Sequence, residues 1–490
     1  MRFGSLSKWL GILGVVSCGV VLAWQWGPAG MARAKPSAPD AFCAVYKDSP
    51  LCSSGSVECT MCHTNPPAMN SFGEQLKSVL LPGQKRPLEH DDFVKALPGA
   101  LKQIETLDAD GDGVNNLKEI LAGYLPADKH NTPTDLKGSC EPGKGGSCGY
   151  DHKYAYKKVY LDFCGESPTY GDLLAFDKEK DKKAKAEIIK KLLTKCLNTN
   201  FWVGKEGVVW RLGHDKIRPL QAVKSGVDEG PVPLADYYDD YNLFVYSQID
   251  NRDARELLTG QYFVKRTDGS STTRYEVRSA TEDRRQGQDV AKDKRAGILT
   301  SRWTLIFFNM FSVIPRATAA QAYRSYLGMD IARMQGLYSV RNEPADYDNK
   351  NVRATGCKGC HQTLDAMSYP FTRYNGLTFN VGRVASYTPE RMKRFVNVEG
   401  PRIAHVPEAG FILGKRVKNL LEWAKVAANS DEFAKATVMD YWKLLLGSKP
   451  AQPKEREEYE KLWKDFKNKY QYSVERMLYA LVQTEAYGVP

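Results

Sequence analysis

Apolar residues recur at three- and four-residue intervals over much of the chain, and this spacing predicts amphipathic helices. In the middle of the chain the pattern covers residues 184–197, 237–260, 302–312 and 319–337. Residues 415–487 predict three or four more helices, whose core faces include Leu462, Trp463, Phe466, Met477, Leu478 and Leu481. Alternation typical of strands is scarce, and one short hairpin is expected over residues 272–279. The pattern therefore predicts a mainly α protein with little β structure.

The longest apolar stretch lies at the N-terminus and is typical of an export signal. Arg2 and Lys8 precede an apolar run over residues 9–26, and Ala32-Arg33-Ala34 supplies a small-x-small cleavage site. We expect residues 1–34 to be removed as a signal peptide. Two alternatives remain open: lipid attachment at Cys18, and retention of the uncleaved run as a membrane anchor.

Composition and charge narrow the class of protein. The 490 residues are 42% hydrophobic and 26% charged, which describes a globular chain of two to four domains and excludes disordered and collagen-like proteins. The net charge is +11, and it falls to +8 if residues 1–34 are lost with Arg2, Lys8 and Arg33. A basic exported protein can meet acidic proteins or anionic lipid headgroups, so peripheral membrane association is possible. Nucleic acid is not an expected partner in that compartment.

Five consecutive residues occur twice in a pattern that attaches haem. Cys59-Thr60-Met61-Cys62-His63 and Cys357-Lys358-Gly359-Cys360-His361 both fit C-x-x-C-H. Two closely spaced thiols can form thioethers with one porphyrin, and the adjacent imidazole can then bind its iron. A zinc site or a redox-active dithiol would leave the histidine after each pair unexplained. We therefore expect two covalent haem c groups, with His63 and His361 as axial iron ligands.

The other cysteines are expected to form disulfides, because the chain is predicted to be exported. Six remain when Cys18 and the two C-x-x-C-H motifs are set aside. Proximity in sequence favours Cys43 with Cys52, Cys140 with Cys148 and Cys164 with Cys196, although other connectivities are possible.

Residues 108–119, DADGDGVNNLKE, match the calcium-binding loop D-x-[DN]-x-[DN]-G-x5-E. The oxygen ligands offered are carboxylates of Asp108, Asp110, Asp112 and Glu119, the carbonyl of Val114 and the side chain of Asn116, while Gly113 permits the sharp turn. A helix beginning at Pro98 and an apolar stripe of Leu117, Ile120, Leu121 and Tyr124 are expected to flank the loop. A single loop of this type predicts one structural Ca²⁺ rather than a paired calcium sensor; an empty acidic turn is the alternative.

These features divide the chain into successive regions. Residues 35–138 are expected to form a first haem c module with the EF-hand-like calcium loop. A Gly-rich segment near residues 138–149 is the best linker. Residues 139–350 form a helical middle region, and 351–490 a second haem c module with the C-terminal helices.

Two parts of the chain resemble known families. The stretch CTMCHTNPPAMNSFG from Cys59, followed by the Asp-rich loop, resembles exported bacterial haem c modules with an Asn-x-Phe-Gly between the haem motif and a D-x-D-x-D-G loop. The second half is similar to planctomycete-type cytochrome c proteins, through DARELLT from Asp253, RAGILT from Arg295, CKGCHQTLDAMSYPFTRYNG from Cys357, and C-terminal residues 433–487. This chain has Leu364-Asp365-Ala366-Met367-Ser368 where that family usually has Asp-Pro followed by a Gly. The resemblance implies a cell-envelope haem protein with electron-transfer character.

The sixth iron ligand decides whether a haem only transfers electrons or also binds small molecules. The candidates for the first haem are His90, His130 and Met69; those for the second are His405, Met367, Met439 and His214. Sequence motifs for phosphoryl, hydride and common hydrolytic chemistry are missing.

We therefore expect an exported di-haem c-type cytochrome of the periplasm or cell envelope of a bacterium, relaying single electrons between redox protein partners. The alternative is a di-haem oxidoreductase, peroxidase- or oxygenase-like, with one ligand-accessible haem.

Overall fold

The computed structural model describes residues 38–52, 57–65, 68–84, 88, 90–129, 149–217, 238–278, 290–309, 312–378 and 383–489. It is 58% helical and 7% strand, which confirms the mainly α class. In these ranges the strands pair only as short two-stranded antiparallel sheets. The signal segment with Cys18, and also His130, Cys140 and Cys148, lie outside the described residues, as does the side chain of His90. No described helix is both long and apolar enough to cross a membrane.

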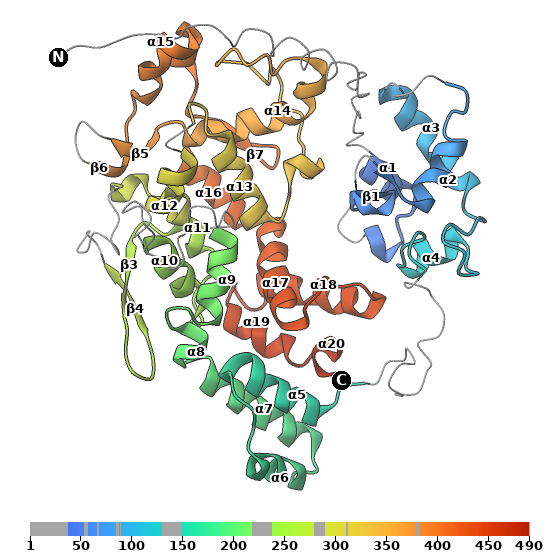
Figure 1. Cartoon of the computed structure of the whole chain (residues 1–490), viewed down its shortest axis with the longest axis vertical. Coiled ribbons are helices and arrows are strands. Elements are labelled where there is room, and N and C mark those ends of the chain that lie inside the picture. Colours follow the sequence, from blue (N-terminus) through green and yellow to red (C-terminus); the bar gives the residue numbers. More distant parts are fainter. Residues whose placement is uncertain are drawn as a thin grey trace, which may run out of the picture.

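Residues 38–129 form a lobe of their own beside the rest of the chain (Figure 1). Its elements are α1 (Ala38–Val45), η1 (Pro50–Cys52), η2 (Cys59–Met61), β1 (His63–Asn65), β2 (Ala68–Met69), α2 (Ser71–Val79), α3 (His90–Gln103) and α4 (Asn116–Ala122). Phe42, Phe72, Leu101 and Ile120 belong to a separate hydrophobic core at its centre. The predicted disulfide between Cys43 and Cys52 joins α1 to η1 and is confirmed.

The helix before the calcium loop differs from the prediction. It begins at His90, so Pro98 lies inside α3 rather than at its start. Proline removes one helical hydrogen bond, but burial of Leu97 and Leu101 on either side of Pro98 favours continuation of the helix. The apolar stripes on both sides of the calcium loop are also narrower than predicted, because Leu107 and Leu121 are 42% and 49% exposed and do not join the core.

The middle of the chain folds into short helices, of which α5, α6 and α7 lie at the lower end of the main body and α9 lies beside α10 (Figure 1). They are α5 (His152–Val159), η3 (Tyr160–Cys164), α6 (Tyr170–Lys178), α7 (Lys182–Cys196), α8 (Asn200–Val203) and α9 (Val208–Ile217). The second predicted disulfide, Cys164 with Cys196, joins η3 to α7 and is confirmed. The predicted helix over 184–197 corresponds to α7.

The next elements along the chain are α10 (Asp239–Gln248), α11 (Glu256–Thr259), the hairpin β3 (Phe263–Thr267) with β4 (Arg274–Arg278), η6 (Lys292–Lys294), η7 (Gly297–Thr300), α12 (Arg302–Thr304) and η8 (Leu305–Asn309). The single helix predicted over 237–260 is therefore two, because the backbone turns through left-handed conformations at Asp250 and Asn251. The predicted hairpin is longer than expected and starts at Phe263.

The remaining elements complete the body: α13 (Arg316–Leu327), η9 (Ile331–Arg333), α14 (Thr355–Ser368), η10 (Tyr369–Phe371), β5 (Tyr374–Thr378), β6 (Arg383–Tyr387), η12 (Arg391–Phe395), α15 (Val396–Glu399), η13 (Pro401–His405), β7 (Gly410–Ile412), β8 (Lys415–Val417), α16 (Leu420–Ala428), α17 (Asp431–Leu446), α18 (Pro453–Asn468), α19 (Val474–Leu481) and α20 (Glu485–Gly488). The helix predicted over 319–337 ends at Gly328, whose φ of 68° terminates α13.

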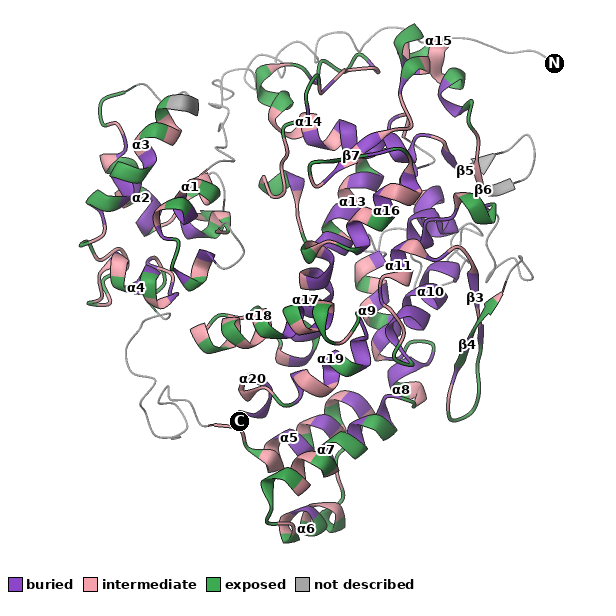
Figure 2. Ribbon diagram, turned by 180° about the vertical axis from the view of Figure 1, so that it is seen from behind, coloured by how far each residue is buried: buried purple, intermediate pink, exposed green. Residues whose placement is uncertain are grey.

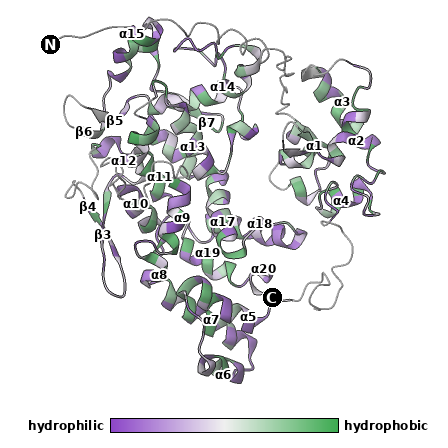
Figure 3. Ribbon diagram, in the orientation of Figure 1, coloured by the Kyte–Doolittle hydropathy of each residue, from purple (hydrophilic) through white to green (hydrophobic). Residues whose placement is uncertain are grey.

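One large hydrophobic core runs from Ala155 to Tyr487, so the middle and C-terminal parts pack together rather than as separate cores. Buried residues gather on α10, α13 and α17 (Figure 2), and every residue of α10 is buried. The outer helix α18 is mostly hydrophilic (Figure 3) and buries Leu462, Trp463 and Phe466 as predicted. The predicted core residues of α19, Met477, Leu478 and Leu481, are also buried.

Candidate functional sites

The first C-x-x-C-H motif lies on a tight turn followed by a hairpin. Cys59 and Cys62 are free thiols at the two ends of η2, where the Cys62 N–H donates to the Cys59 carbonyl at 3.2 Å. His63 starts β1, which pairs with β2. Met61 between the thiols is 3% exposed and belongs to the lobe's core. Its burial attaches the motif to the core, while Cys59 remains partly exposed.

The Asn-x-Phe-Gly stretch of this chain, Asn70-Ser71-Phe72-Gly73, fixes the turn through hydrogen bonds and close packing. In the sequence it stood out only as part of the resemblance to haem c modules. The Asn70 amide donates to the carbonyls of Thr60 at 2.9 Å and Met61 at 3.1 Å. Its side-chain oxygen accepts from the Gly73 N–H at 2.8 Å and begins α2. A Cβ on Gly73 would lie 2.0 Å from the Cys62 carbonyl oxygen, so only glycine permits this approach. Asn70 and Gly73 therefore position the first motif.

The His63 imidazole is oriented by a backbone carbonyl. Its Nδ1 lies 3.2 Å from the Ala68 oxygen. A carbonyl can only accept, so Nδ1 carries the proton and the lone pair of Nε2 remains available to a metal. This orientation is what an axial ligand needs.

The second motif lies on a helix. Cys357, Cys360 and His361 belong to α14, and the spacing of three and four residues places them on one face of the helix. Cys357 is exposed, and Cys360 and His361 are partly exposed. Both thiols are free. Ala366, which stands where the resembled family has proline, is fully buried inside α14 and lets the helix continue to Ser368.

His361 has a buried carboxylate as its partner, which sequence reasoning did not single out. Its Nδ1 lies 2.8 Å from Oδ1 of Asp365, one helical turn further along α14. Asp365 is 0% exposed and accepts two hydrogen bonds from Arg316 at the start of α13. Burial alone would raise the pKa of Asp365, but the hydrogen bonds from Arg316 and His361 outweigh it and lower the pKa. The carboxylate therefore accepts from Nδ1–H and leaves Nε2 available.

The four thiols are not arranged for zinc. Burial raises the pKa of Cys59 and Cys360, and that of Cys62 to about 12, so the metal-free thiols are protonated at neutral pH. In the described part of the chain, the side chains whose ligand atoms gather to within 4.8 Å are Asp108, Asp110 and Asp112. The cysteine pairs instead remain separate, each beside its own histidine.

The two motifs nevertheless meet the same short loop. The Cys59 thiol donates to the Arg333 carbonyl at 3.4 Å, and the Cys360 sulfur lies 3.6 Å from the Met334 sulfur. From the covalent dimensions of these adjacent residues, the two cysteine sulfurs are at most about 14 Å apart. Met334 has a φ of 61°, a left-handed conformation that is uncommon outside glycine. Nothing in the sequence pattern had indicated Arg333 or Met334.

Most of the side chains predicted as distal iron ligands have other surroundings in the structure. Met69 pairs with His63 across the hairpin, and its sulfur would lie 3.1 Å from a Cβ on Gly73. Met367 is 1% exposed and packs into the main core. The Nδ1 of His214 bonds the Tyr241 hydroxyl on α10. Met439 is partly buried on α17, and His405 is exposed on η13.

The predicted calcium loop folds around its own carboxylates. The N–H groups of Gly111 and Gly113 donate to Asp108 at 2.7 and 2.8 Å, and those bonds lower the pKa of Asp108. The N–H of Val114 donates to Asp112 at 2.8 Å. Gly113 has a φ of 92°, as the sharp turn requires. Asn116 and Glu119, both 0% exposed, complete the loop from α4.

Several buried oxygens of this loop lack a hydrogen-bond partner among the described residues. They are Oδ2 of Asp110, Oδ2 of Asp112, Oδ1 of Asn116 and both carboxylate oxygens of Glu119. Burial, together with the charges of Asp110, Asp112 and Asp108, raises the pKa of Glu119 to about 8. Buried polar groups are normally satisfied, so these unpartnered oxygens, three of whose neighbours (Asp108, Asp110 and Asp112) bring ligand atoms to within 4.8 Å of one another, are arranged as candidate ligands of a cation. The donor set is all oxygen, which fits Ca²⁺.

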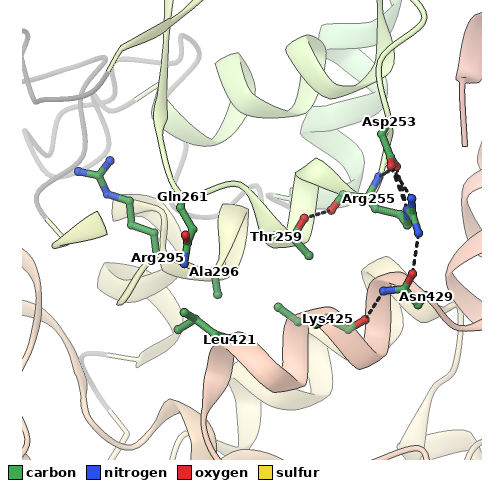
Figure 4. A pocket seen from close by; sticks show the side chains of 10 residues that line it. Asp253, Arg255, Thr259, Gln261, Arg295, Ala296, Leu421, Lys425 and Asn429 are labelled. Carbon is green, nitrogen blue, oxygen red and sulfur yellow. Dashed lines mark hydrogen bonds and ion pairs between the residues drawn. The ribbon is translucent and has the colours of Figure 1, made fainter. Parts of the chain in front are cut away.

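A pocket of about 460 Å³ lies away from both cysteine motifs, between α11 and α16 (Figure 4). Residues of both the DARELLT and the RAGILT stretch line it. The two stretches pack closely, because a Cβ on Gly297 would lie 2.1 Å from the Leu257 carbonyl oxygen. Arg255 pairs with Asp253 at 2.6 Å and donates to Asn429 at 2.6 Å. Asp253 and Arg255 thus neutralise each other at the edge of the pocket, and we assign the pocket no ligand.

Comparisons with protein-family models, with curated proteins and with solved structures find no match to this chain.

Proposed function

We propose that this protein is an exported c-type cytochrome with two covalent haems that relays single electrons between redox partners of the bacterial cell envelope. The observation that carries the proposal is the repeated unit of two free thiols beside an imidazole whose Nδ1 faces an acceptor. Haem, when bound, supplies reversible one-electron exchange.

Each residue of the unit has a definite task. The pairs Cys59 with Cys62 and Cys357 with Cys360 would tether the two groups. His63 and His361 would bind the irons through Nε2, each held in orientation through Nδ1. The contacts of Cys59 with Arg333 and of Cys360 with Met334 support a compact pair, because the loop that bears both is continuous.

The calcium loop belongs to the same proposal. Gln75 on α2 donates to the Asp108 carbonyl at 2.9 Å and accepts from the Asn116 amide at 2.9 Å. Helix α2 begins at the Asn70 cap that holds the first motif. We propose that one Ca²⁺, bound by Asp108, Asp110, Asp112, Val114, Asn116 and Glu119, stiffens the lobe that carries the first haem.

Covalent haem content tests the proposal directly. The mature protein, produced with a haem c maturation system and then denatured, should keep its visible absorption and the mass of two haems. Double replacement of Cys59 and Cys62 by Ala, or of Cys357 and Cys360, should remove one haem each. The matched control is replacement of Cys164 and Cys196, a disulfide pair, which should leave both haems attached. A colourless denatured polypeptide would contradict the proposal.

The mature N-terminus tests export separately. Cleavage after Ala34 predicts a chain beginning at Lys35 in the periplasmic fraction, measured by intact mass. An N-terminus at Cys18 that carries lipid would instead show that the protein is anchored to the membrane and is not cleaved after Ala34. This result would not affect the haem assignment.

A di-haem oxidoreductase is the second candidate, and the surroundings of His361 favour it. Of the four predicted distal ligands of the second haem, Met367 is buried in the core and His214 is bonded to Tyr241, so these two side chains are already engaged within the protein. Spectra of the ferric and ferrous protein with and without carbon monoxide or cyanide distinguish the two functions. Two low-spin, unreactive haems would support the relay, whereas a ligand-binding haem at the second motif would support the oxidoreductase.

A further inference from the structure

The two histidines of the C-x-x-C-H motifs have partners of different charge. At His63 the partner of Nδ1 is the neutral carbonyl of Ala68, at 3.2 Å in an exposed hairpin. At His361 it is the carboxylate of Asp365, at 2.8 Å and with 0% exposure. The identical sequence motif therefore sits in two different electrostatic settings.

The carboxylate behind His361 is itself held by a buried ion network. Nε and Nη2 of Arg316 donate to the two oxygens of Asp365 at 2.6 and 2.8 Å. The same guanidinium bonds both oxygens of Asp348, which is 3% exposed, at 2.5 and 3.0 Å. Two carboxylates share one guanidinium, so the network has a net charge of −1 beside His361. Bidentate pairing on both sides fixes the position of Asp365.

This setting favours the more positive oxidation state at the second site. A carboxylate that accepts from Nδ1–H makes the imidazole a stronger donor to its metal, more so than a neutral carbonyl does. Ferric haem carries one more positive charge than ferrous haem, and a buried negative charge interacts with it in a medium of low dielectric constant. Both effects lower the reduction potential, and second-shell hydrogen bonding is one of the ways a protein sets it.

We infer that Asp365 is a positioning residue that fixes His361 and gives the second haem site a lower reduction potential than the first. The inference rests on the proposed function. One electron added to the fully oxidised protein then resides mainly at the first site, in the lobe that contains the calcium loop. Arg316 and Asp348 act through Asp365 and do not contact the imidazole in the described structure.

Potential titrations of the intact, mature, haem-loaded protein test the order of the two sites. The wild type should show two separate one-electron transitions. The variant in which Cys357 and Cys360 are both replaced by Ala should retain the upper transition and lose the lower one. Cys357 is exposed and Cys360 is only partly buried at the edge of the core, and alanine keeps the apolar contact of the Cβ at both positions. Retention of the lower transition instead would overturn the inference.

Asp365→Asn tests the cause. Asn keeps the size and an acceptor oxygen but removes the charge. We therefore expect the equilibrium constant for reduction of the second site to increase at least tenfold, which raises the potential of the lower transition by about 59 mV for one electron. The upper transition is the internal control and should not move. Asp440→Asn is the matched control, because Asp440 is a mostly buried carboxylate that pairs with Lys216 rather than with a histidine. It should leave both transitions in place.

An unchanged lower transition in Asp365→Asn, or an equal shift of both transitions, contradicts the role of Asp365. If that variant does not retain its second haem, the comparison of the wild type with the Cys357 and Cys360 variant still decides the order. A wild-type protein without visible absorption overturns the proposed function as well, and its missing colour distinguishes this outcome from a reversed order of potentials.

Discussion

The buried carboxylate of Glu119 makes the calcium-free protein sensitive to pH in a defined direction. Glu119 is 0% exposed, and burial with the neighbouring charges of Asp110 and Asp112 raises its pKa from 4.5 to about 8. The folded, calcium-free lobe therefore keeps a proton that the unfolded chain releases. The contribution of Glu119 to its stability is greatest below pH 4.5 and is lost as the pH rises through the window from 4.5 to about 8.

The size of the effect follows from the shift in pKa. One unit corresponds to 1.36 kcal/mol, so the full loss above pH 8 is about 5 kcal/mol. Between pH 5 and pH 7 the free energy of unfolding should fall by about 2.5 kcal/mol. Bound Ca²⁺ reverses the sign, because the ion then competes with the proton for an ionised carboxylate and stability rises with pH.

Amide hydrogen exchange of residues 90–129 measures this lobe separately from the main body. Opening free energies, corrected for the intrinsic pH dependence of exchange, are compared at pH 5 and pH 7 with a chelator and with excess Ca²⁺. Glu119→Gln removes this carboxyl, so its pH slope with the chelator should be much smaller than that of the wild type, and it should gain much less from Ca²⁺. Glu74→Gln, at an exposed ion pair with Lys77, should behave as the wild type. Equal pH slopes for the wild type and Glu119→Gln in chelator would refute the reasoning.

Three further predictions concern the first motif and the disulfides. Asn70→Ala removes two donated hydrogen bonds and one accepted one, a loss of about 3 kcal/mol, so the protein should carry mainly the second haem by intact mass. Gly73→Ala should have the same result because its Cβ would meet the Cys62 carbonyl at 2.0 Å, whereas Gly99→Ala, which meets nothing within 4 Å, should keep both haems. Replacing Cys164 and Cys196 by Ala, 32 residues apart, should lower the free energy of unfolding in urea by about 3.7 kcal/mol. Replacing Cys43 and Cys52, 9 residues apart, should cost about 2.6 kcal/mol, and a larger effect of this pair would contradict the loop-entropy argument.

Local patterns in the sequence were sufficient wherever neighbouring residues decide the structure. The helical class, the buried faces of α18 and α19 and two disulfides between nearby cysteines are confirmed. The predictions failed where a local backbone feature or distant packing decides an element's end. Asp250 and Asn251 break the expected helix before α11, and core packing extends α3 through Pro98.

The residue types and spacing of the C-x-x-C-H motifs and the calcium loop could be read from the sequence alone, because each is a contiguous segment whose ligands are set by covalent spacing. Only the tertiary structure brings Arg316 and Asp348 to Asp365, and Arg333 and Met334 to the two cysteine motifs. These contacts join residues that are 26 to 274 positions apart. Sequence periodicity contains no information about such distances, since it is the packing of separate helices and lobes that closes them.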